Sequence, residues 1–298
     1  MAVSTMTEVQ HRFIETNGIR LHYVTQGSGP LMLFLHGFPE FWYSWRHQIP
    51  EFAQDHTVVA LDLRGYNDSD KPEGVAAYRI EELVKDIAGV VRGLGYDRCV
   101  LVGHDWGGAI AWTFAYEYPE LLEALVVLNI PHPARFRAGL QMPQQLLKSS
   151  YIAFFQIPAL PELVIQAGDY ALLEQAFRGM AVRPNTFSDQ DIAAYKDAVA
   201  KRGALTAMLN YYRAAPNSPL LKRAWGVLTV PTMLIWGEND TALSKELSQG
   251  TEEYVNDFHL RYIANCSHWV QQEQPEQVNR YIREFLAMEH HHSAQRRD

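Results

Sequence analysis

One stretch constrains the fold of this chain more than any other: VGHDWGGAI, at residues 102–110. An apolar run precedes it, a helical pattern follows it, and Gly103, Gly107 and Gly108 surround Asp105. A strand that turns abruptly into a helix crowds its neighbours, and glycine removes the clash. The order small-x-nucleophile-x-small is typical of turns that present a nucleophile, as in G-x-S-x-G. Here a carboxylate stands where that pattern has serine. The flanking strand and helix disfavour the alternative, a glycine-rich turn with a capping aspartate.

Short apolar runs between turn residues recur along the chain and predict strands buried on both faces, as in a parallel sheet. These runs lie at residues 31–35, 57–61, 99–103, 124–128 and 232–236, with a more amphipathic candidate at 259–263. The alternating segment 19–27 predicts an antiparallel edge strand at the start. Amphipathic helices are predicted at 80–94, 108–119 and 275–288. Alternating strands and helices indicate an α/β fold with a mostly parallel, doubly wound sheet.

This alternation stops between about Pro133 and Lys222, where helical patterns and aromatic residues occur without a clear buried strand. We therefore predict an α/β core made of residues 1–132 and 223–298, interrupted by a helical cap at 133–222. The chain has 298 residues, 47 % of them apolar, which is enough for one large core.

Charge and composition argue against several classes of partner. The net charge is −8 and no cluster of lysine and arginine stands out, so nucleic acid is not expected. The two cysteines, Cys99 and Cys266, are too few for a disulfide framework, and no zinc-like spacing occurs. We expect neither a metal nor a cofactor. No apolar run of about 18 residues and no leader-like start occur, so we expect a cytoplasmic protein without a membrane partner. Both a monomer and a homodimer fit the sequence.

Two polar residues follow the later predicted strands. Asp240 lies just beyond the strand that ends near Trp236, and His268 follows the last strand. Ligands of open α/β sheets bind outside the carboxyl ends of the strands. Asp105, Asp240 and His268 are therefore predicted to meet as nucleophile, acid and histidine. Glu238 is a competing acid with a less suitable position in its loop.

Backbone donors for an oxyanion are predicted from two places. The turn HGFP at 36–39 follows a buried strand and can aim the N–H of Phe38 at the site. Trp106, the residue after the nucleophile, supplies a second N–H. The Phe38-Pro39 pair allows a cis peptide bond. An ordinary tight turn is the alternative interpretation.

Taken together, these segments resemble α/β-hydrolases of the epoxide hydrolase branch, which are similar to haloalkane and haloacetate dehalogenases. The resemblance covers nearly the whole chain through HGFPEFWYSWRHQ, DLRGYNDSDKP, GHDWGGAIAW, NIPHPARF, WGEND and SHWVQQEQPEQV. GHDWGG with HGFPE is moderately specific to this branch. The chain departs from the family at Asn67, where RGYG usually has glycine. The resemblance implies the α/β-hydrolase fold and the conversion of a small apolar epoxide to a diol.

An aspartate nucleophile suits a substrate that has no carbonyl at the reacting carbon. With an ordinary pKa of about 3.9, Asp105 is ionised at neutral pH and can attack an sp3 carbon directly, forming an ester. His268, oriented by Asp240, then activates water against that ester. The aspartate at the position where the pattern has serine therefore predicts a covalent ester intermediate.

The resemblance further implies two cap tyrosines that protonate the epoxide oxygen. Tyr151 in SSYIAFFQIP and Tyr212 in MLNYYRA match these positions. Their competitors are Tyr170 and Tyr211, because a tyrosine on a helical cap is more often a packing residue. A phenol with a pKa near 10 keeps its proton at neutral pH and can donate it.

Two other functions remain as alternatives. Haloalkane dehalogenases commonly have asparagine after HG, where this chain has Phe38, and fluoroacetate dehalogenases resemble HDRxxR, which has no counterpart after His104. The indole N–H of Trp106 could still bind a halide. The alternative of another class is a receptor that binds a small molecule in the same pocket. Retention of the complete predicted set argues against a receptor: Asp105, Asp240, His268, Tyr151 and Tyr212.

Overall fold

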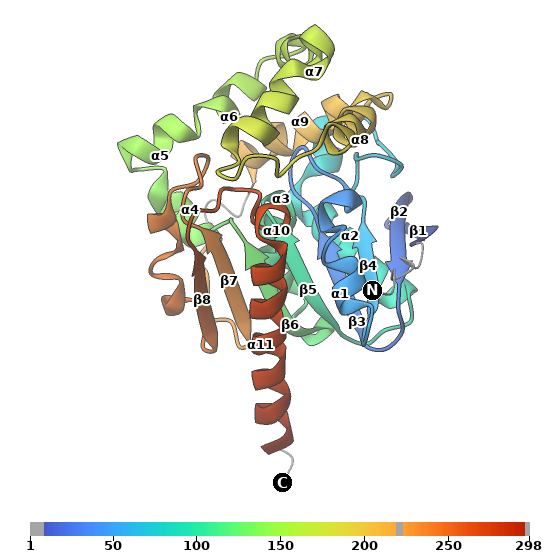
Figure 1. Ribbon diagram of the computed structural model, residues 1–298, viewed down its shortest axis with the longest axis vertical. Coiled ribbons are helices and arrows are strands. Elements are labelled where there is room, and N and C mark those ends of the chain that lie inside the picture. Colours follow the sequence, from blue (N-terminus) through green and yellow to red (C-terminus); the bar gives the residue numbers. More distant parts are fainter. Residues whose placement is uncertain (1–8, 219–222, 296–298) are drawn as a thin grey trace.

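A single mixed sheet organises the structure, a computed structural model that describes residues 9–218 and 223–295 (Figure 1). The strand order is β1-β2-β4-β3-β5-β6-β7-β8. The strands are β1 (Gln10–Thr16), β2 (Ile19–Gln26), β3 (Leu31–Leu35), β4 (Thr57–Leu61), β5 (Cys99–His104), β6 (Leu122–Leu128), β7 (Thr232–Gly237) and β8 (Phe258–Ile263). Strands β3 to β8 are parallel, whereas β1 and β2 pair antiparallel. The predicted α/β fold with a mostly parallel sheet is confirmed.

The start of the sheet differs from the prediction. Strand β2 is antiparallel as predicted, but the prediction that it forms the edge was wrong, because β1 pairs with it on the outside. Asn17 and Gly18 connect the two strands with φ angles of 47° and 74°, as the tight turn of a two-residue hairpin requires. Strand β1 is mostly exposed, so it lacks the alternation that predicts a strand. The Asn-Gly pair was the signal available in the sequence.

Helices cover both faces of the sheet. They are α1 (Ile49–Phe52), α2 (Ile80–Gly93), α3 (Trp106–Glu117), α10 (Val270–Glu273) and α11 (Pro275–Gln295), joined by the 3₁₀ turns η1 (Trp42–Trp45), η2 (Val75–Tyr78), η3 (Pro119–Leu121), η6 (Lys245–Ser248) and η7 (Thr251–Glu253). Helices α1 and α11 pack on one face with strand residues such as Phe34 and Val102. Helices α2 and α3 pack on the other face with Leu33 and Leu101. Successive strand residues point to opposite faces, so two apolar layers require continuous apolar runs.

Between β6 and residue 218 the regular elements are all helices, and they lie beyond the carboxyl ends of the parallel strands (Figure 1). They are α4 (Pro133–Gly139), α5 (Pro143–Lys148), α6 (Ser150–Phe155), α7 (Leu160–Met180), α8 (Asp189–Ala200), α9 (Ala204–Ala214) and the turn η4 (Ala215–Asn217). We call residues 133–218 the helical insertion. The predicted cap boundaries stay a prediction, and residues 219–222 of that cap lie outside the described residues, as does the start at 1–8. The two ends of the insertion meet, since Arg137 Nη1 donates to the Arg223 carbonyl oxygen at 3.3 Å.

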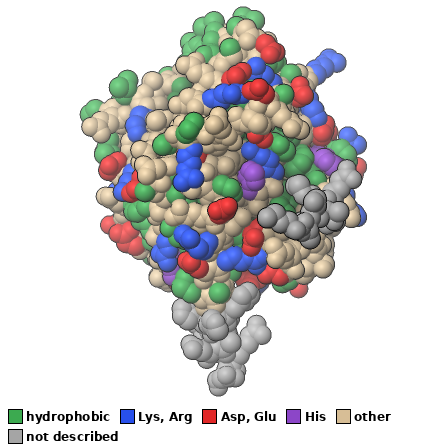
Figure 2. Space-filling view, in the orientation of Figure 1, with side chains coloured by type: hydrophobic (Ala, Val, Ile, Leu, Met, Phe, Trp, Pro, Cys, Tyr) green, Lys and Arg blue, Asp and Glu red, His purple; other side chains and the backbone are tan. Residues whose placement is uncertain are grey.

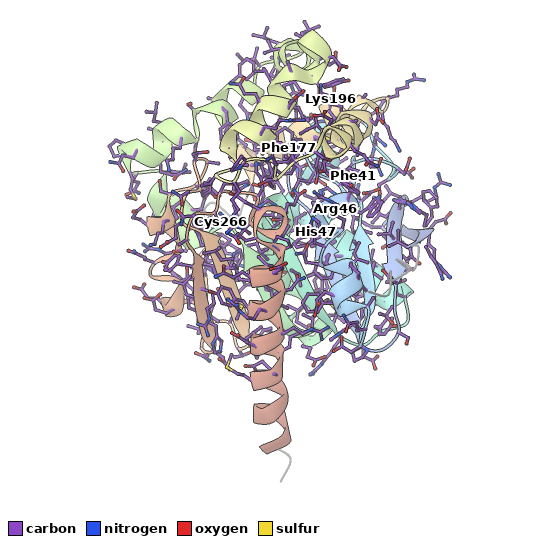
Figure 3. The ribbon with its side chains drawn as sticks, in the orientation of Figure 1. Phe41, Arg46, His47, Phe177, Lys196 and Cys266 are labelled. Atoms are coloured by element: carbon purple, nitrogen blue, oxygen red, sulfur yellow. The ribbon has the colours of Figure 1, made fainter. Side chains whose placement is uncertain are left out.

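Aromatic rings join the helical insertion to the loops after β3 and β8, and Figure 3 labels two of them, Phe177 and Phe41. Phe177 of α7 stacks on Tyr195 of α8 with ring centroids 4.2 Å apart, and its ring lies 4.6 Å from that of Trp269. Tyr195 in turn meets Phe41 edge-on at 5.6 Å. All four rings are buried. Such contacts bury large apolar areas and favour one defined placement of the insertion on the core.

A buried glutamine adds hydrogen bonds at the same interface between the insertion and the core. Gln272 Nε2 donates to Glu40 Oε1 at 2.8 Å. Its Oε1 accepts from the Tyr195 hydroxyl at 2.5 Å and from Arg46 Nη1 at 2.6 Å. One side chain therefore connects the insertion to the loops after β3 and β8.

The outer surface shows no sorting of charge on the face drawn in Figure 2, where acidic and basic side chains are interspersed. Within the described ranges, no helix combines the length and the apolar character needed to cross a membrane.

Candidate active site

The sharp turn predicted at Asp105 is present between β5 and α3. Asp105 adopts φ 49° and ψ −118°, a strained conformation for a residue with a side chain. The turn requires glycine around it. A Cβ on Gly107 would lie 2.2 Å from the Leu35 carbonyl oxygen, and one on Gly103 would lie 2.5 Å from the Gly107 carbonyl oxygen. Backbone atoms cannot move aside, so these glycines allow the strand, the turn and the helix to pack closely.

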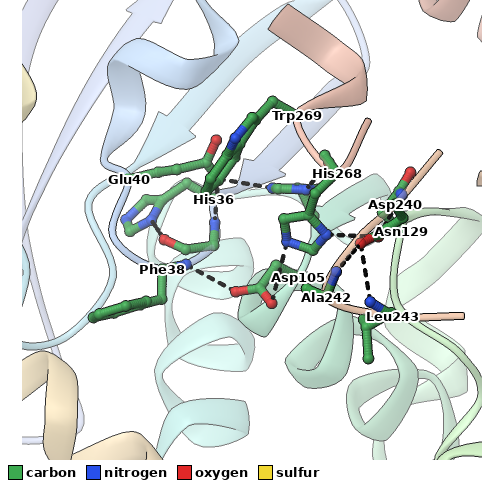
Figure 4. A network of polar contacts seen from close by, with 12 residues as sticks. His36, Phe38, Glu40, Asp105, Asn129, Asp240, Ala242, Leu243, His268 and Trp269 are labelled. Carbon is green, nitrogen blue, oxygen red and sulfur yellow. Dashed lines mark hydrogen bonds and ion pairs between the residues drawn. The ribbon is translucent and has the colours of Figure 1, made fainter. Parts of the chain in front are cut away.

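The two carboxylate oxygens of Asp105 have different partners (Figure 4). Oδ1 accepts a hydrogen bond from the Phe38 backbone N–H at 2.8 Å. Oδ2 lies 3.6 Å from His268 Nε2. The Phe38–Pro39 peptide bond is cis, the form that the X-Pro pair allows. Gly37 leaves room for the carboxylate, because a Cβ there would lie 2.5 Å from Asp105 Cβ.

Asp240 orients His268 from the loop after β7. His268 Nδ1 and Asp240 Oδ2 are 2.7 Å apart, and both residues are buried. Asp240 Oδ1 accepts from the backbone N–H groups of Ala242 and Leu243 at 2.8 and 2.9 Å. Glu238, the competing acid, pairs instead with Lys245. The structure thus places Asp240 at the histidine, in the predicted order.

The electrostatics of these three groups are coupled. Burial would raise the pKa of Asp105, but contact with His268 and its charge hold it below the usual range. Burial also opposes ionisation of Asp240, and the charge of His268 outweighs that effect and lowers its pKa. Burial disfavours a charged histidine, yet the charge of Asp240 and the contact with Asp105 raise the pKa of His268 well above its usual value. At rest the site therefore holds an imidazolium between two carboxylates.

Tyr151 of α6 and Tyr212 of α9 bring their rings together, with centroids 5.9 Å apart and planes at 77°. The ring of Tyr212 also meets those of Phe38 and Trp106 at 5.2 and 5.1 Å. Burial and the charge of Asp105 raise the pKa of Tyr151, and burial and Tyr151 raise that of Tyr212. Both phenols therefore keep their protons at neutral pH.

The competing tyrosines lie elsewhere. The hydroxyl of Tyr211 donates to the Arg64 carbonyl oxygen at 2.7 Å, which engages its proton in a buried structural contact. Tyr170 belongs to a kink of α7 with φ 58° and lines neither of the two cavities beside Asp105.

Two cavities meet at the nucleophile. The larger measures about 430 Å³ and the smaller about 180 Å³. Their shared lining consists of Asp105, Tyr151, Tyr212 and Leu243. The remaining lining is predominantly apolar in both, as in sites that hold small organic molecules. The carboxylate of Asp105 and the two phenols therefore lie where the two apolar cavities meet.

Comparison with known proteins places this geometry in a family. Residues 30–275 match the model of the alpha/beta hydrolase fold family. Human Epoxide hydrolase 4 is 45 % identical over 284 residues, covering 93 % of this chain and 78 % of that protein. A crystal structure of Bacillus megaterium epoxide hydrolase with an inhibitor matches with a TM-score of 0.87 and 40 % identity, covering 93 % and 100 % of the two chains. The chain belongs to the epoxide hydrolase branch of the α/β-hydrolase family.

A Bacillus subtilis member, AB hydrolase superfamily protein YfhM, is 45 % identical over 285 residues, covering 94 % of this chain and 99 % of that protein. At position 67, where the resemblance implies a glycine, this chain has asparagine. It adopts φ 40°, a conformation that asparagine tolerates better than most residues. Its Nδ2 donates to Asp62 Oδ2 at 2.7 Å, so the replacement adds a hydrogen bond and keeps the turn.

Asn129 is a site residue that the sequence did not reveal. Its Nδ2 donates to Asp240 Oδ2 at 2.7 Å, and its Oδ1 accepts from the Gly237 N–H at 2.9 Å. Asn129 thus fixes the same oxygen that binds His268. The available signal was its position directly after β6, at the carboxyl edge of the sheet.

Glu40 and His104 form a second pair that sequence reasoning did not connect. His104 Nδ1 lies 2.8 Å from Glu40 Oε2, and its Nε2 lies 2.8 Å from the His268 carbonyl oxygen. Glu40 Oε2 also accepts from the Gly37 N–H at 2.8 Å. Both side chains are fully buried. They hold the turn that carries Phe38 against the loop that carries His268.

Proposed function

We propose that the protein hydrolyses epoxides to vicinal diols through a covalent ester of Asp105. The observation that carries the proposal is the Asp105 carboxylate, with Oδ1 on the Phe38 N–H, at the junction of two apolar cavities. Two protonated tyrosines line the same junction. The similarity to human Epoxide hydrolase 4 and to the Bacillus megaterium epoxide hydrolase supports the same activity.

In the first step Oδ2 of Asp105 attacks a carbon of the epoxide ring. The new C–O bond forms as the ring C–O bond breaks, and the bonding electron pair stays on the departing oxygen. That alkoxide takes a proton from Tyr151 or Tyr212, since it is far more basic than a phenol. The product is an ester of Asp105 with the β-hydroxyalkyl group and a tyrosinate.

In the second step His268 becomes the base. The ester has no charge, so only Asp240 still favours the imidazolium, and the pKa of His268 falls. The imidazolium releases one proton and the tyrosinate takes one up, so the site contains a neutral His268 and a neutral tyrosine. Neutral His268 then takes a proton from water, which attacks the ester carbon. The oxyanion forms at Oδ1, where the Phe38 N–H and, in our proposal, the Trp106 N–H stabilise it. When this intermediate collapses, the bond between the carboxyl carbon and Oδ2 breaks, and the diol leaves with Oδ2 and a proton from His268. The water oxygen stays in the carboxyl group of Asp105, whose proton returns to His268 and restores the resting site.

The same nucleophile would serve a dehalogenase, but the surroundings favour epoxides. A departing halide needs donors and no acid, whereas a departing alkoxide needs a proton. The Phe38 side chain has no donor, and the Trp106 indole ring packs edge-on against Tyr212, with ring centroids 5.1 Å apart. A receptor would need neither an oriented histidine nor a strained nucleophile.

The test follows the oxygen atoms. A single turnover of a small aryl epoxide in ¹⁸O water, with enzyme in excess, should place the label in the Asp105 carboxylate and leave the diol unlabelled. Peptide mass spectrometry reads the label, and Asp105→Ala serves as the control that takes up none. Label in the diol after one turnover would mean direct attack by water and would overturn the proposal.

A further inference from the structure

The larger cavity contains one cationic side chain that the proposed chemistry does not use. Lys148, the last residue of α5, lines this cavity and is half-buried. Its Nζ donates to the Asp240 carbonyl oxygen at 3.3 Å. Asp240 directly precedes Thr241, Ala242 and Leu243, which form part of the cavity wall. The ammonium group therefore lies at that wall.

No carboxylate lies within ion-pair distance of Lys148 in the described part of the chain. Most other lysines there have one, for example Lys85 with Glu82 and Lys196 with Glu174. A half-buried ammonium group loses hydration that a carbonyl oxygen replaces only in part. It consequently favours an anion beside it.

The two cavities differ in charge beyond the atoms that they share. Lys148 is the only lysine or arginine among the described residues that line the larger cavity. The described lining of the smaller cavity contains neither lysine nor arginine, and its only charged side chain is that of Asp105. Asp105 lines both cavities, so the difference in charge comes from Lys148 and His268, which line only the larger one. A substituent with a negative charge is therefore favoured in the larger cavity over the smaller.

We propose that Lys148 selects epoxides that carry a carboxylate on the substituent occupying the larger cavity. This inference rests on the proposed function and names a substrate class for it. One ammonium group matches one negative charge, and the long flexible lysine side chain can follow carboxylates at several distances from the ring. The smaller cavity would then hold the apolar substituent on the other side of the epoxide.

The experiment compares ω-epoxy carboxylic acids of three chain lengths with their primary amides, which have nearly the same shape and no charge. The quantity measured is the ratio of kcat/KM for acid to that for amide. We expect the wild type to prefer at least one acid. Lys148→Met should lower that ratio about tenfold, as for a charge-assisted contact in a partly buried site. Lys148→Arg should retain most of it. Lys85→Met, on the outer surface of α2, is the matched control and should leave it unchanged.

High salt should reduce the preference of the wild type, because screening weakens a partly exposed ion pair. A wild type that does not distinguish acid from amide at any chain length would overturn the proposal. An unchanged ratio in Lys148→Met would also overturn it, even with both rates lowered, because Lys148 would then only support the Asp240 loop. Turnover of the amides by an Asp105-dependent route tests the proposed function separately, so the two failures can be distinguished.

Discussion

His268 lies between two carboxylates, and its environment changes during the reaction. In the resting site Asp240 and Asp105 both stabilise its protonated form, which raises its pKa. The proposed alkylation would remove the charge of Asp105 and keep that of Asp240. A histidine that is cationic before alkylation and neutral afterwards can stabilise the nucleophile first and activate water later.

This order of charge states predicts that ester hydrolysis depends on pH near neutrality and that alkylation does not. Ester hydrolysis requires neutral His268, so its rate should fall as the pH is lowered. Alkylation requires ionised Asp105, whose pKa is held below its usual range, so its rate should stay flat between about pH 6 and 8. Stopped-flow tryptophan fluorescence at each pH separates the two phases. A pH-independent hydrolysis phase beside a titrating alkylation phase would contradict the assignment of His268.

The two phenols allow a prediction that is selective for the leaving group. The double change of Tyr151 and Tyr212 to phenylalanine should slow alkylation by an epoxide by roughly 10²–10⁴-fold, the range for general acid catalysis. Alkylation by an alkyl halide should fall much less, because a halide leaves without a proton. Tyr170→Phe is the control, since Tyr170 lines neither cavity. An unchanged epoxide rate in the double variant would assign both tyrosines to packing.

The positions of the candidate catalytic residues could be predicted to the extent that local sequence encodes them. Asp105 and Phe38 follow buried strands in short motifs whose backbone geometry is local. Asn129 could not be found in this way, because its partner Asp240 is 111 positions away and only the folded sheet brings the two together. The sequence likewise shows no reason why Glu40 should face His104.

Among the elements, the turn from β5 to α3 has the least tolerance for change. A methyl group on Gly107 would meet the backbone of β3, which cannot shift without disturbing the sheet. We expect Gly107→Ala to lower the free energy of unfolding by about 3 kcal/mol or to prevent folding. Gly179→Ala in α7 is the matched control, because its Cβ would meet only Gln175 Cγ at 3.7 Å. Helix propensity predicts that this control is neutral or slightly stabilising. Urea denaturation measures both, and a Gly107→Ala protein of wild-type stability would contradict the prediction.

Sheet elements follow closely from the sequence because burial on both faces leaves a continuous apolar run. The runs at 31–35 and 57–61 coincide with β3 and β4, and the run at 99–103 lacks only the last residue of β5. Strand β1 was missed because its side chains face solvent. The kink of α7 at 167–170 also has no local signature beyond Gly168.

At the scale of the whole molecule, Gln272 forms buried hydrogen bonds that link the helical insertion to the core. Gln272→Leu would remove a donor from Glu40 and an acceptor from Tyr195 and Arg46. We expect a loss of about 2 kcal/mol in the free energy of unfolding, because buried polar groups lose their partners. Hydrogen exchange in α8 should become faster.

The matched control is Gln277→Leu, because the Gln277 side chain donates to Tyr281 within α11 and makes no contact with the insertion. Denaturation and hydrogen exchange measured on both variants test the role of Gln272. Unchanged exchange in α8 would show that Gln272 is not needed to place the insertion.

The contact between Arg137 and Arg223 has a consequence for how such a protein can diversify. Because the chain leaves the core and returns to it at neighbouring points, a recombination event could exchange everything in between as a cassette. A short linker could close the gap without straining the strands, since bridging nearby ends costs little entropy. Asp105, Asp240, His268 and the turn at Phe38 would remain on the core. The residues of the insertion that line the two cavities would be exchanged together with it. Chimeras with joints near these two arginines are therefore the natural units for redesigning what this scaffold accepts.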